Sequence, residues 1–256
     1  MWRGMAPIVG LCGTTVVHAA DRAPVRVVRY ALAPAWVIAA PKGSDAPTPP
    51  GAPLRLISAD QQVHVTDRGQ EEYQATKLAL LTPEALAAGN LTMTWSPANE
   101  EMIVHRLAII RDDQAIDVLA TQKFTVIQRE NNLEQSALDG NLTATLQIAG
   151  LQVGDVLEFA ITTVRRQTSL GERPQGFMQF PVAGVRGAYR VRLIAPTGAG
   201  IAFRASADLP QPVVRDMGLE TERQLTLADP ASVTIPDGAP LRYSIARLMQ
   251  FSGYSD

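Results

Sequence analysis

The chain offers few side chains that could act as a nucleophile or hold a metal. Its 256 residues contain one cysteine, Cys12, and three histidines. A serine hydrolase built on a nucleophile elbow needs a strained Gly-x-Ser-x-Gly turn, which the sequence lacks. His64 and His105 have no histidine or cysteine partner at metal-ligand spacing. The sequence therefore predicts no catalytic residues and no metal ligands.

Cofactor motifs are also incomplete. Gly198 and Gly200 begin like a dinucleotide-binding fingerprint, but Phe203 stands where the third glycine belongs. No Walker phosphate loop is present. Since the glycines lie between two alternating segments, we interpret them as a tight turn and predict no cofactor.

One acidic cluster could carry chemistry. Asp112, Asp113 and Asp117 could form a carboxylate pair or a calcium loop, although their spacing does not match a calcium loop. The alternative is a β-hairpin turn, because aspartate tolerates left-handed backbone angles and bonds its own backbone. We favour the turn.

Period-2 alternation is the dominant pattern from residue 54 onward. Val63 and Val65 alternate with polar residues, and similar patterns recur along the chain. Alternating segments are predicted at residues 91–95, 102–110, 157–162, 189–194 and 201–206. In residues 102–110, Ile103, His105, Leu107 and Ile109 are expected to share one face. Such spacing with glycine and proline punctuation favours an antiparallel sandwich over a βαβ fold.

Helical signals are few. Residues 82–89 carry a threonine cap, a proline at the first helical position and a closing glycine, which predicts a helix of about two turns. Residues 129–138 predict a second short helix. The expected fold class is therefore all-β: an antiparallel β-sandwich of two packed sandwich-like subdomains with one or two short helices.

The N-terminus resembles a secretory signal peptide. Arg3 precedes a short apolar stretch, and Val17-His18-Ala19 fits the small-x-small pattern for cleavage before Ala20. The alternative is a buried N-terminal element. Export to the periplasm of a Gram-negative envelope is expected, and cleavage would remove Cys12, leaving no thiol.

Composition restricts the partners. The 23 basic and 25 acidic residues give a net charge of -2, so no nucleic-acid partner is expected. Beyond the N-terminus, no apolar run approaches the ~20 residues of a membrane span. Residues 39–53 contain five prolines among alanine, glycine and serine, which predicts an extended linker or strap.

An ordered set of segments carries a resemblance to a known family. The segments are Pro34-Ala35-Trp36-Val37, Trp95-Ser96-Pro97, His105, Ile109-Ile110-Arg111-Asp112, Ile116-Asp117-Val118-Leu119, Gln128-Arg129-Glu130, Leu138-Asp139-Gly140-Asn141-Leu142-Thr143 and Gly154-Asp155. Together they resemble the domain of unknown function that precedes the transglutaminase-like domain in bacterial envelope proteins. Asp113 departs from the family, which tends to have glycine there.

The resemblance implies a β-sandwich module without assigned catalytic residues. Its signature positions are Trp36, His105, Arg111, Asp117, Glu130, Asp139, Gly140, Thr143, Gly154 and Asp155. His105 is interpreted as a packed core histidine rather than a ligand. Arg111, Asp117 and Glu130 either form a buried ion-pair network or line a groove facing the next domain. The structural role is favoured, because no nucleophile accompanies them.

The sequence predicts five segments and leaves three alternative functions open. Residues 1–19 are expected to be the signal peptide, 20–53 an extension and linker, 54–165 and 166–245 two β subdomains, and 246–256 a junction to a transglutaminase-like domain. The leading hypothesis is a non-enzymatic accessory module that positions that domain, in cis or in trans, or presents its protein substrate. Envelope proteins are further candidate partners. The alternatives are a stand-alone adhesion or binding module, and a carboxylate-dependent hydrolase.

Overall fold

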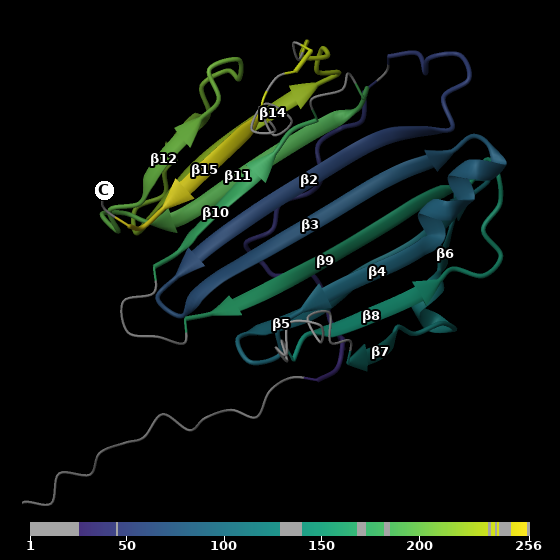
Figure 1. Cartoon of the computed structure of the whole chain (residues 1–256), viewed down its shortest axis with the longest axis horizontal. Coiled ribbons are helices and arrows are strands. Elements are labelled where there is room, and N and C mark those ends of the chain that lie inside the picture. The colour runs from purple at the N-terminus through teal and green to yellow at the C-terminus, as the bar shows by residue number, and fades with distance from the viewer. Residues whose placement is uncertain are drawn as a thin grey trace, which may run out of the picture.

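A computed structural model describes residues 26–44, 46–128, 140–167, 173–181, 185–234, 237–238, 240 and 247–254. Over these residues the strands form three sheets (Figure 1). The expected signal peptide, the expected helix at 129–138, Glu130 and Asp139 lie outside the described residues.

The large sheet has nine strands in the order β1-β5-β9-β3-β2-β11-β14-β13, with β6 paired to β5. Its strands are β1 (Arg29–Tyr30), β2 (Leu54–Thr66), β3 (Gly69–Leu80), β5 (Glu100–Arg111), β6 (Gln114–Asp117), β9 (Val156–Arg166), β11 (Ala188–Pro196), β13 (Val213–Asp216) and β14 (Glu220–Ala228). Pairing is antiparallel except between β1 and β5 and between β2 and β11.

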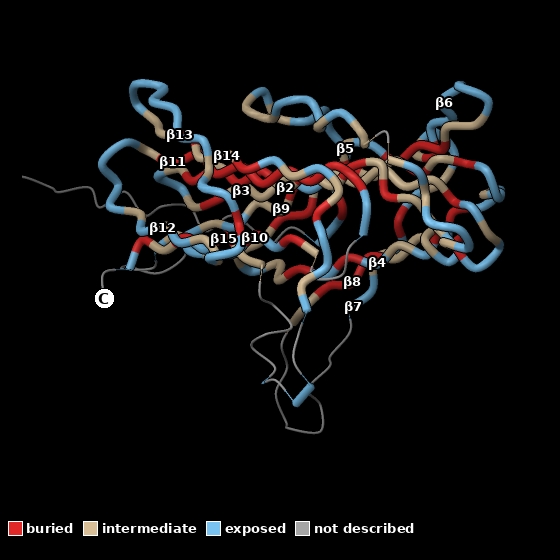
Figure 2. The backbone as a smooth tube through the Cα atoms, turned by 90° about the horizontal axis from the view of Figure 1, so that it is seen from above, coloured by how far each residue is buried: buried red, intermediate tan, exposed pale blue. Residues whose placement is uncertain are grey.

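Two three-stranded sheets cover opposite ends of one face of the large sheet (Figure 2). Sheet B contains β4 (Asn90–Trp95), β8 (Leu142–Gln147) and β7 (Thr125–Gln128), in that order. Sheet C contains β10 (Gln175–Gln179), β15 (Leu248–Ser252) and β12 (Ala202–Ala205). The molecule is thus two sandwiches that share one long layer, and the all-β prediction is confirmed.

Each sandwich has its own hydrophobic core. Sheet B contributes Trp95 and Leu142 to a core with Val104 and Leu107 of β5. Sheet C contributes Met178, Met249 and Phe251 to a second core, where they pack against the following residues of β2 and β11: Val63, Val65, Tyr189, Val191 and Leu193. The alternation of β2 and β11 directs these side chains to one face. The large sheet crosses the expected subdomain boundary at residue 165, because β2 pairs with β11.

A β-bulge changes the face assigned to His105. The pairing of β5 with β9 shifts register between Val104 and Arg106, so Val104 and Leu107 both face the core. His105 falls at the shift, is half-buried, and contacts Thr162 and Tyr73 on the polar side of the sheet. The prediction that His105 packs in the core is therefore wrong. One extra residue in a strand moves the side chains beyond it to the other face of the sheet.

Helical structure is confined to two 3₁₀ segments among the described residues. η1 (Pro83–Gly89) is the short helix predicted from the threonine, proline and glycine pattern. η2 (Val118–Ala120) follows β6. None of the helices in the described ranges is long and apolar enough to cross a membrane.

Candidate functional site

The face of the large sheet opposite the two cores carries a buried polar layer. Asp60 and Gln62 alternate with the core valines of β2, and Arg190 and Arg192 alternate with the core residues of β11. The register places Asp60 opposite Arg190 and Gln62 opposite Arg192. All four residues are no more than 6% exposed, so they need internal partners.

Two ion pairs hold these groups. Arg190 binds both carboxylate oxygens of Asp60, with Nε–Oδ1 2.9 Å and Nη2–Oδ2 2.5 Å. Arg192 donates from Nε to Glu222 of β14, which also receives Arg215 at 3.2 Å. Burial alone would raise the pKa of the Glu222 carboxyl, but the two guanidinium groups hold that pKa below its usual value. The charges are therefore fixed in one geometry.

An extended segment, residues 26–44, covers this polar layer and is called the strap below. In Figure 1 it is the purple segment that passes behind the long strands. Arg192 Nη1 donates to the carbonyl of Trp36 at 2.7 Å. Gln62 bonds both main-chain groups of Ile38, accepting from its N–H at 3.1 Å and donating to its carbonyl at 2.9 Å. The sheet side chains thus hold the strap mainly by its backbone.

Trp36, a predicted signature residue, anchors the middle of the strap. Its indole Nε1 donates to Glu71 at 2.7 Å, and its ring centroid lies 5.3 Å from that of His64. His64 in turn lies 2.6 Å from a carboxylate oxygen of Glu220. The indole is therefore held between a carboxylate and an imidazole.

His105 joins the same polar face at the other end of the strap. Its Nδ1 lies 2.9 Å from the carbonyl of Ala31 and its Nε2 lies 2.7 Å from the hydroxyl of Thr162. The ring also packs on Tyr73, at 5.8 Å between centroids. A hydroxyl beside an imidazole is a nucleophile–base arrangement. Thr162 is fully buried, however, so its oxygen cannot reach a substrate.

Arg111 pairs with Asp155, both signature residues, and not with Asp117. Its Nε and Nη2 meet the two Asp155 oxygens at 2.7 and 2.8 Å. Asp155 also accepts from the Gln152 N–H. The hydrogen bonds from Arg111 are the main reason that the pKa of the Asp155 carboxyl lies below its usual value. With Gly154 at φ +97°, the pair fixes the turn before β9.

The acidic cluster and the remaining signature residues have local roles. Asp112 and Asp113 have φ of 50° and 59° and join β5 to β6 in a two-residue hairpin turn. The carboxylate of Asp117 accepts from Leu119 N–H at the start of η2. Gly140 has a positive φ of 63°. Thr143 is buried, and its hydroxyl lies 3.4 Å from that of Thr94 on the paired strand.

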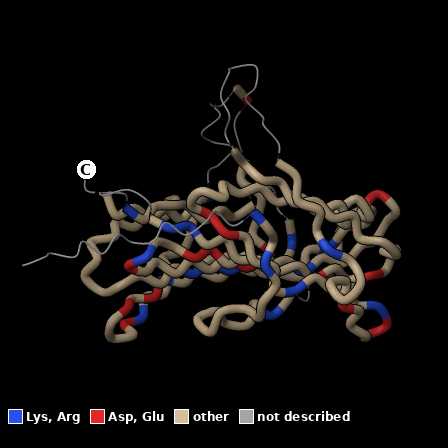
Figure 3. Tube along the Cα trace, turned by 90° about the horizontal axis from the view of Figure 1, so that it is seen from below, with Lys and Arg blue, Asp and Glu red and all other residues tan. Residues whose placement is uncertain are grey.

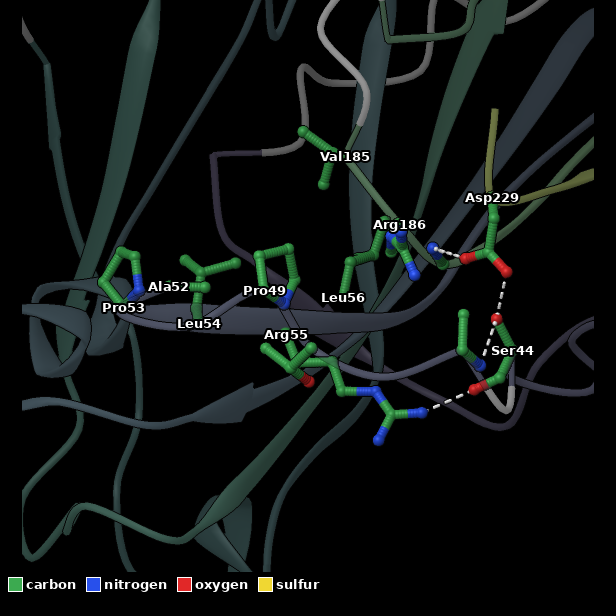
Figure 4. A pocket seen from close by; sticks show the side chains of 13 residues that line it. Ser44, Pro49, Ala52, Pro53, Leu54, Arg55, Leu56, Val185, Arg186 and Asp229 are labelled. Atoms are coloured by element: carbon green, nitrogen blue, oxygen red, sulfur yellow. Dashed lines mark hydrogen bonds between the residues drawn. The ribbon is translucent and has the colours of Figure 1, made fainter. Parts of the chain in front are cut away.

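A cavity of about 250 Å³ lies where the strap ends (Figure 4). It is lined by the proline-containing segment before β2 and by Gly187, Arg186 and Asp229. Asp229 accepts from Ser44 Oγ and from the Gly187 N–H at 2.9 Å. Nearby, burial and then the Asp229 charge raise the pKa of Tyr189 to about 12. These polar groups tie the strap to β11.

A second hollow, of about 420 Å³, lies on the outer face of sheet C. Phe177, Gln250 and Arg204 form one row across the three strands, and Tyr254 lies beside it. Phe177 is 58% exposed and Tyr254 43% exposed. We call this surface the sheet C groove. It combines exposed aromatic area with one guanidinium group.

The model of one protein family matches residues 66–234, more than half of the chain. That family is described as a domain of unknown function, DUF3857, with solved structures. The chain belongs to the DUF3857 family. No protein in the curated set compared with it matches.

The DUF3857 chain is also similar to solved structures. A "putative protease" from Parabacteroides distasonis shares its fold with a TM-score of 0.66 at 14% identity, covering 79% of this chain and 40% of that one. An M1 zinc metallopeptidase from Deinococcus radiodurans aligns over 78% of this chain and 42% of that one at 12% identity, with a TM-score of 0.38, which is too low to indicate a shared fold. This chain therefore spans less than half the length of both.

The polar layer of this DUF3857 chain was missed by sequence reasoning. The sequence motifs point to Trp36 and His105 but not to Gln62, Arg190, Arg192 and Glu222. A signal exists in β11, where two arginines alternate with Tyr189, Val191 and Leu193. Arginines on a central strand need both a covering segment and acidic partners.

Proposed function

We propose that this chain is a non-catalytic accessory module that docks a transglutaminase-like catalytic domain against the sheet C groove. The observation that carries the proposal is the groove itself, with Phe177 58% exposed beside Arg204 and Tyr254. Exposed aromatic and arginine side chains are enriched where proteins bind one another. A domain joined after β15 would begin next to this surface.

The likeness to a longer protein supports a modular role. The Parabacteroides protein shares the fold over 40% of its length, which leaves room there for further domains. Inter-domain surfaces within a chain resemble transient protein interfaces. A single three-stranded sheet face with one guanidinium group fits such a contact.

The arrangement of the polar side chains supports a role without turnover. The described residues include two histidines. His64 bonds to Glu220, and His105 bonds to the Ala31 carbonyl and the Thr162 hydroxyl. Asp112 lies in a hairpin turn, and Asp117 accepts from a backbone N–H. We expect the purified chain to show no cleavage or cross-linking of glutamine-containing peptides. Turnover that survives repurification would reject the proposal.

We also propose that the module is exported to the periplasm and binds no nucleic acid. The signal-peptide pattern of residues 1–19 and the mixed charges support this (Figure 3). Expression in a Gram-negative host should yield a periplasmic protein that begins at or near Ala20. N-terminal sequencing tests this, and a cytoplasmic product that retains Met1 would contradict it.

Docking is tested by isothermal titration calorimetry with a transglutaminase-like domain encoded in the same genome, next to or after this chain. The double variant F177A/R204E should weaken binding at least about tenfold, because removing an interface anchor costs more than about 1 kcal/mol. The matched control is L219A, which removes a side chain 89% exposed on the β13–β14 turn. Equal binding by wild type and the double variant would remove the groove from the interface.

A further inference from the structure

We propose that the polar face of the large sheet is a binding site for an extended, tryptophan-bearing peptide, and that the strap occupies this site in cis. The inference is independent of docking at the sheet C groove. The ligand class is set by four main-chain groups, three carbonyls and one N–H, and by one indole. The partner is a peptide supplied in trans that takes the place of residues 26–44.

Recognition of the strap is directed at atoms that every peptide has. The carbonyls of Ala31, Trp36 and Ile38 meet His105, Arg192 and Gln62 at 2.7–2.9 Å. Arg190 adds a second donor to the Ile38 carbonyl at 3.1 Å. Gln62 pairs with the N–H and the carbonyl of one residue, as a neighbouring strand would. Contacts of this kind tolerate different side chains.

The donors are also held by bonds that do not involve the strap. Asp60 holds Arg190 through two bonds and also accepts from Gln62 at 2.8 Å. Glu222 holds Arg192, which in turn donates to Gln62 at 3.0 Å. A site whose side chains are already ordered loses less entropy when a ligand binds. The polar layer is therefore preorganised to bind an extended peptide.

One side-chain subsite gives the site its selectivity. Glu71 accepts from the Trp36 indole at 2.7 Å while the His64 ring packs at 5.3 Å. By contrast, the strap residue Leu32 is 91% exposed. The matching ligand has tryptophan at one position and accessible main-chain groups two residues later. Phenylalanine would bind less well, because it lacks the N–H that Glu71 accepts.

The strap can be replaced because it contributes little to the cores. Only Val28 of the strap belongs to a hydrophobic cluster. Its strand pairing is limited to Arg29–Tyr30, parallel to β5. A proline-containing segment, residues 46–53, separates the strap from β2. The family match begins at residue 66, so it does not include the strap.

The test uses the full chain carrying Trp36→Ala, which weakens the cis occupant, and a fluorescein-labelled peptide of residues 28–42. Fluorescence anisotropy should show saturable binding to this variant. Wild-type chain should bind the peptide at least about tenfold more weakly, because a tethered competitor acts at millimolar effective concentration. A peptide with alanine in place of tryptophan should bind the variant at least about tenfold more weakly than the parent peptide.

Two further changes in the W36A chain locate the site. R192M should abolish binding and E71A should weaken it about tenfold, whereas R204M on sheet C should leave it unchanged. Glu71 is half-buried at the surface, so E71A tests the site even if R192M does not fold. Circular dichroism confirms that each variant is folded.

Three outcomes would overturn the proposal. The first is no saturable binding by W36A up to millimolar peptide. The second is binding that E71A leaves unchanged. The third is a concentration-dependent dimer of W36A without peptide, measured by light scattering and lost on deleting residues 26–44, because it would make a second copy the occupant.

Discussion

At the residue scale, the charges of the polar layer depend on each other for solvation. The side chains of Arg190 and Asp60 are 6% and 1% exposed. An ion pair so deeply buried is not necessarily stabilising compared with an apolar pair, but removing one partner leaves the other charge without compensation.

R190M is therefore expected to destabilise the protein by about 3–5 kcal/mol, because Asp60 would stay buried with only Gln62 as a side-chain donor. Urea unfolding followed by circular dichroism measures this loss. The matched control is R106M. It breaks the ion pair between Arg106 and Glu158, in which the Arg106 side chain is 51% exposed. That change should cost about 0–1 kcal/mol. Equal losses in both variants would contradict the buried-pair account.

The Arg111–Asp155 pair should make stability depend on pH in the acid range. Because the folded-state pKa of Asp155 lies below its unfolded value, the contribution is complete above the unfolded pKa of about 4. It is lost as the pH falls through the folded pKa. The difference in unfolding free energy between wild type and R111M should therefore shrink below about pH 4. A difference that is constant from pH 7 to pH 2 would contradict this.

At the element scale, the β5–β6 hairpin uses aspartate where glycine is the easier residue. Asp113 has φ of 59°, so the position requires a left-handed backbone. Asp113→Gly should change stability by less than about 1 kcal/mol, whereas Asp113→Val should cost about 1–2 kcal/mol, since a β-branched residue resists this conformation. Denaturant midpoints measure both, and Asp113→Asn is the control that keeps the shape.

The β2–β3 hairpin depends on Gly69 for a different reason. Its φ is +134°, and an added Cβ would lie 2.1 Å from the carbonyl oxygen of Arg165 on β9. Gly69→Ala should lower the melting temperature more than Gly218→Ala, which has a positive φ but nothing within 4 Å. The backbone strain of an alanine at position 69 should alone reduce the free energy of unfolding by about 1–3 kcal/mol. Equal melting temperatures would show that β9 moves aside without cost.

At the scale of the whole molecule, the two cores share one sheet. β2, β3 and β9 form the middle of the nine-stranded layer, and breaking either sandwich exposes strands that the other needs. We therefore expect one unfolding transition, although the sequence suggests two subdomains.

Leu107→Ala and Leu193→Ala test this, since one lies in each core and both are at most 1% exposed. Each substitution should cost about 2–5 kcal/mol and shift the same calorimetric transition. Two separate peaks, each sensitive to only one variant, would show that the sandwiches unfold independently.

The sequence by itself determined the fold class and the inward faces of several strands. Alternation in β2, β9 and β11 assigned Val63, Leu157 and Val191 to the cores, because side chains in strands point to opposite faces in turn. The threonine–proline–glycine pattern located η1, and the paired aspartates marked a turn. These features depend on neighbours in the chain, which is why local patterns predict them.

Only the tertiary structure decided what the polar residues do. The bulge at Val104 and Arg106 moved His105 off the core face, and pairing across the sheet gave Arg111 the partner Asp155 in place of Asp117. The strap over Gln62, Arg190 and Arg192 joins residues more than 20 positions apart. Strand register and the path of a covering segment depend on non-local pairing, so the sequence pattern of one strand cannot specify them.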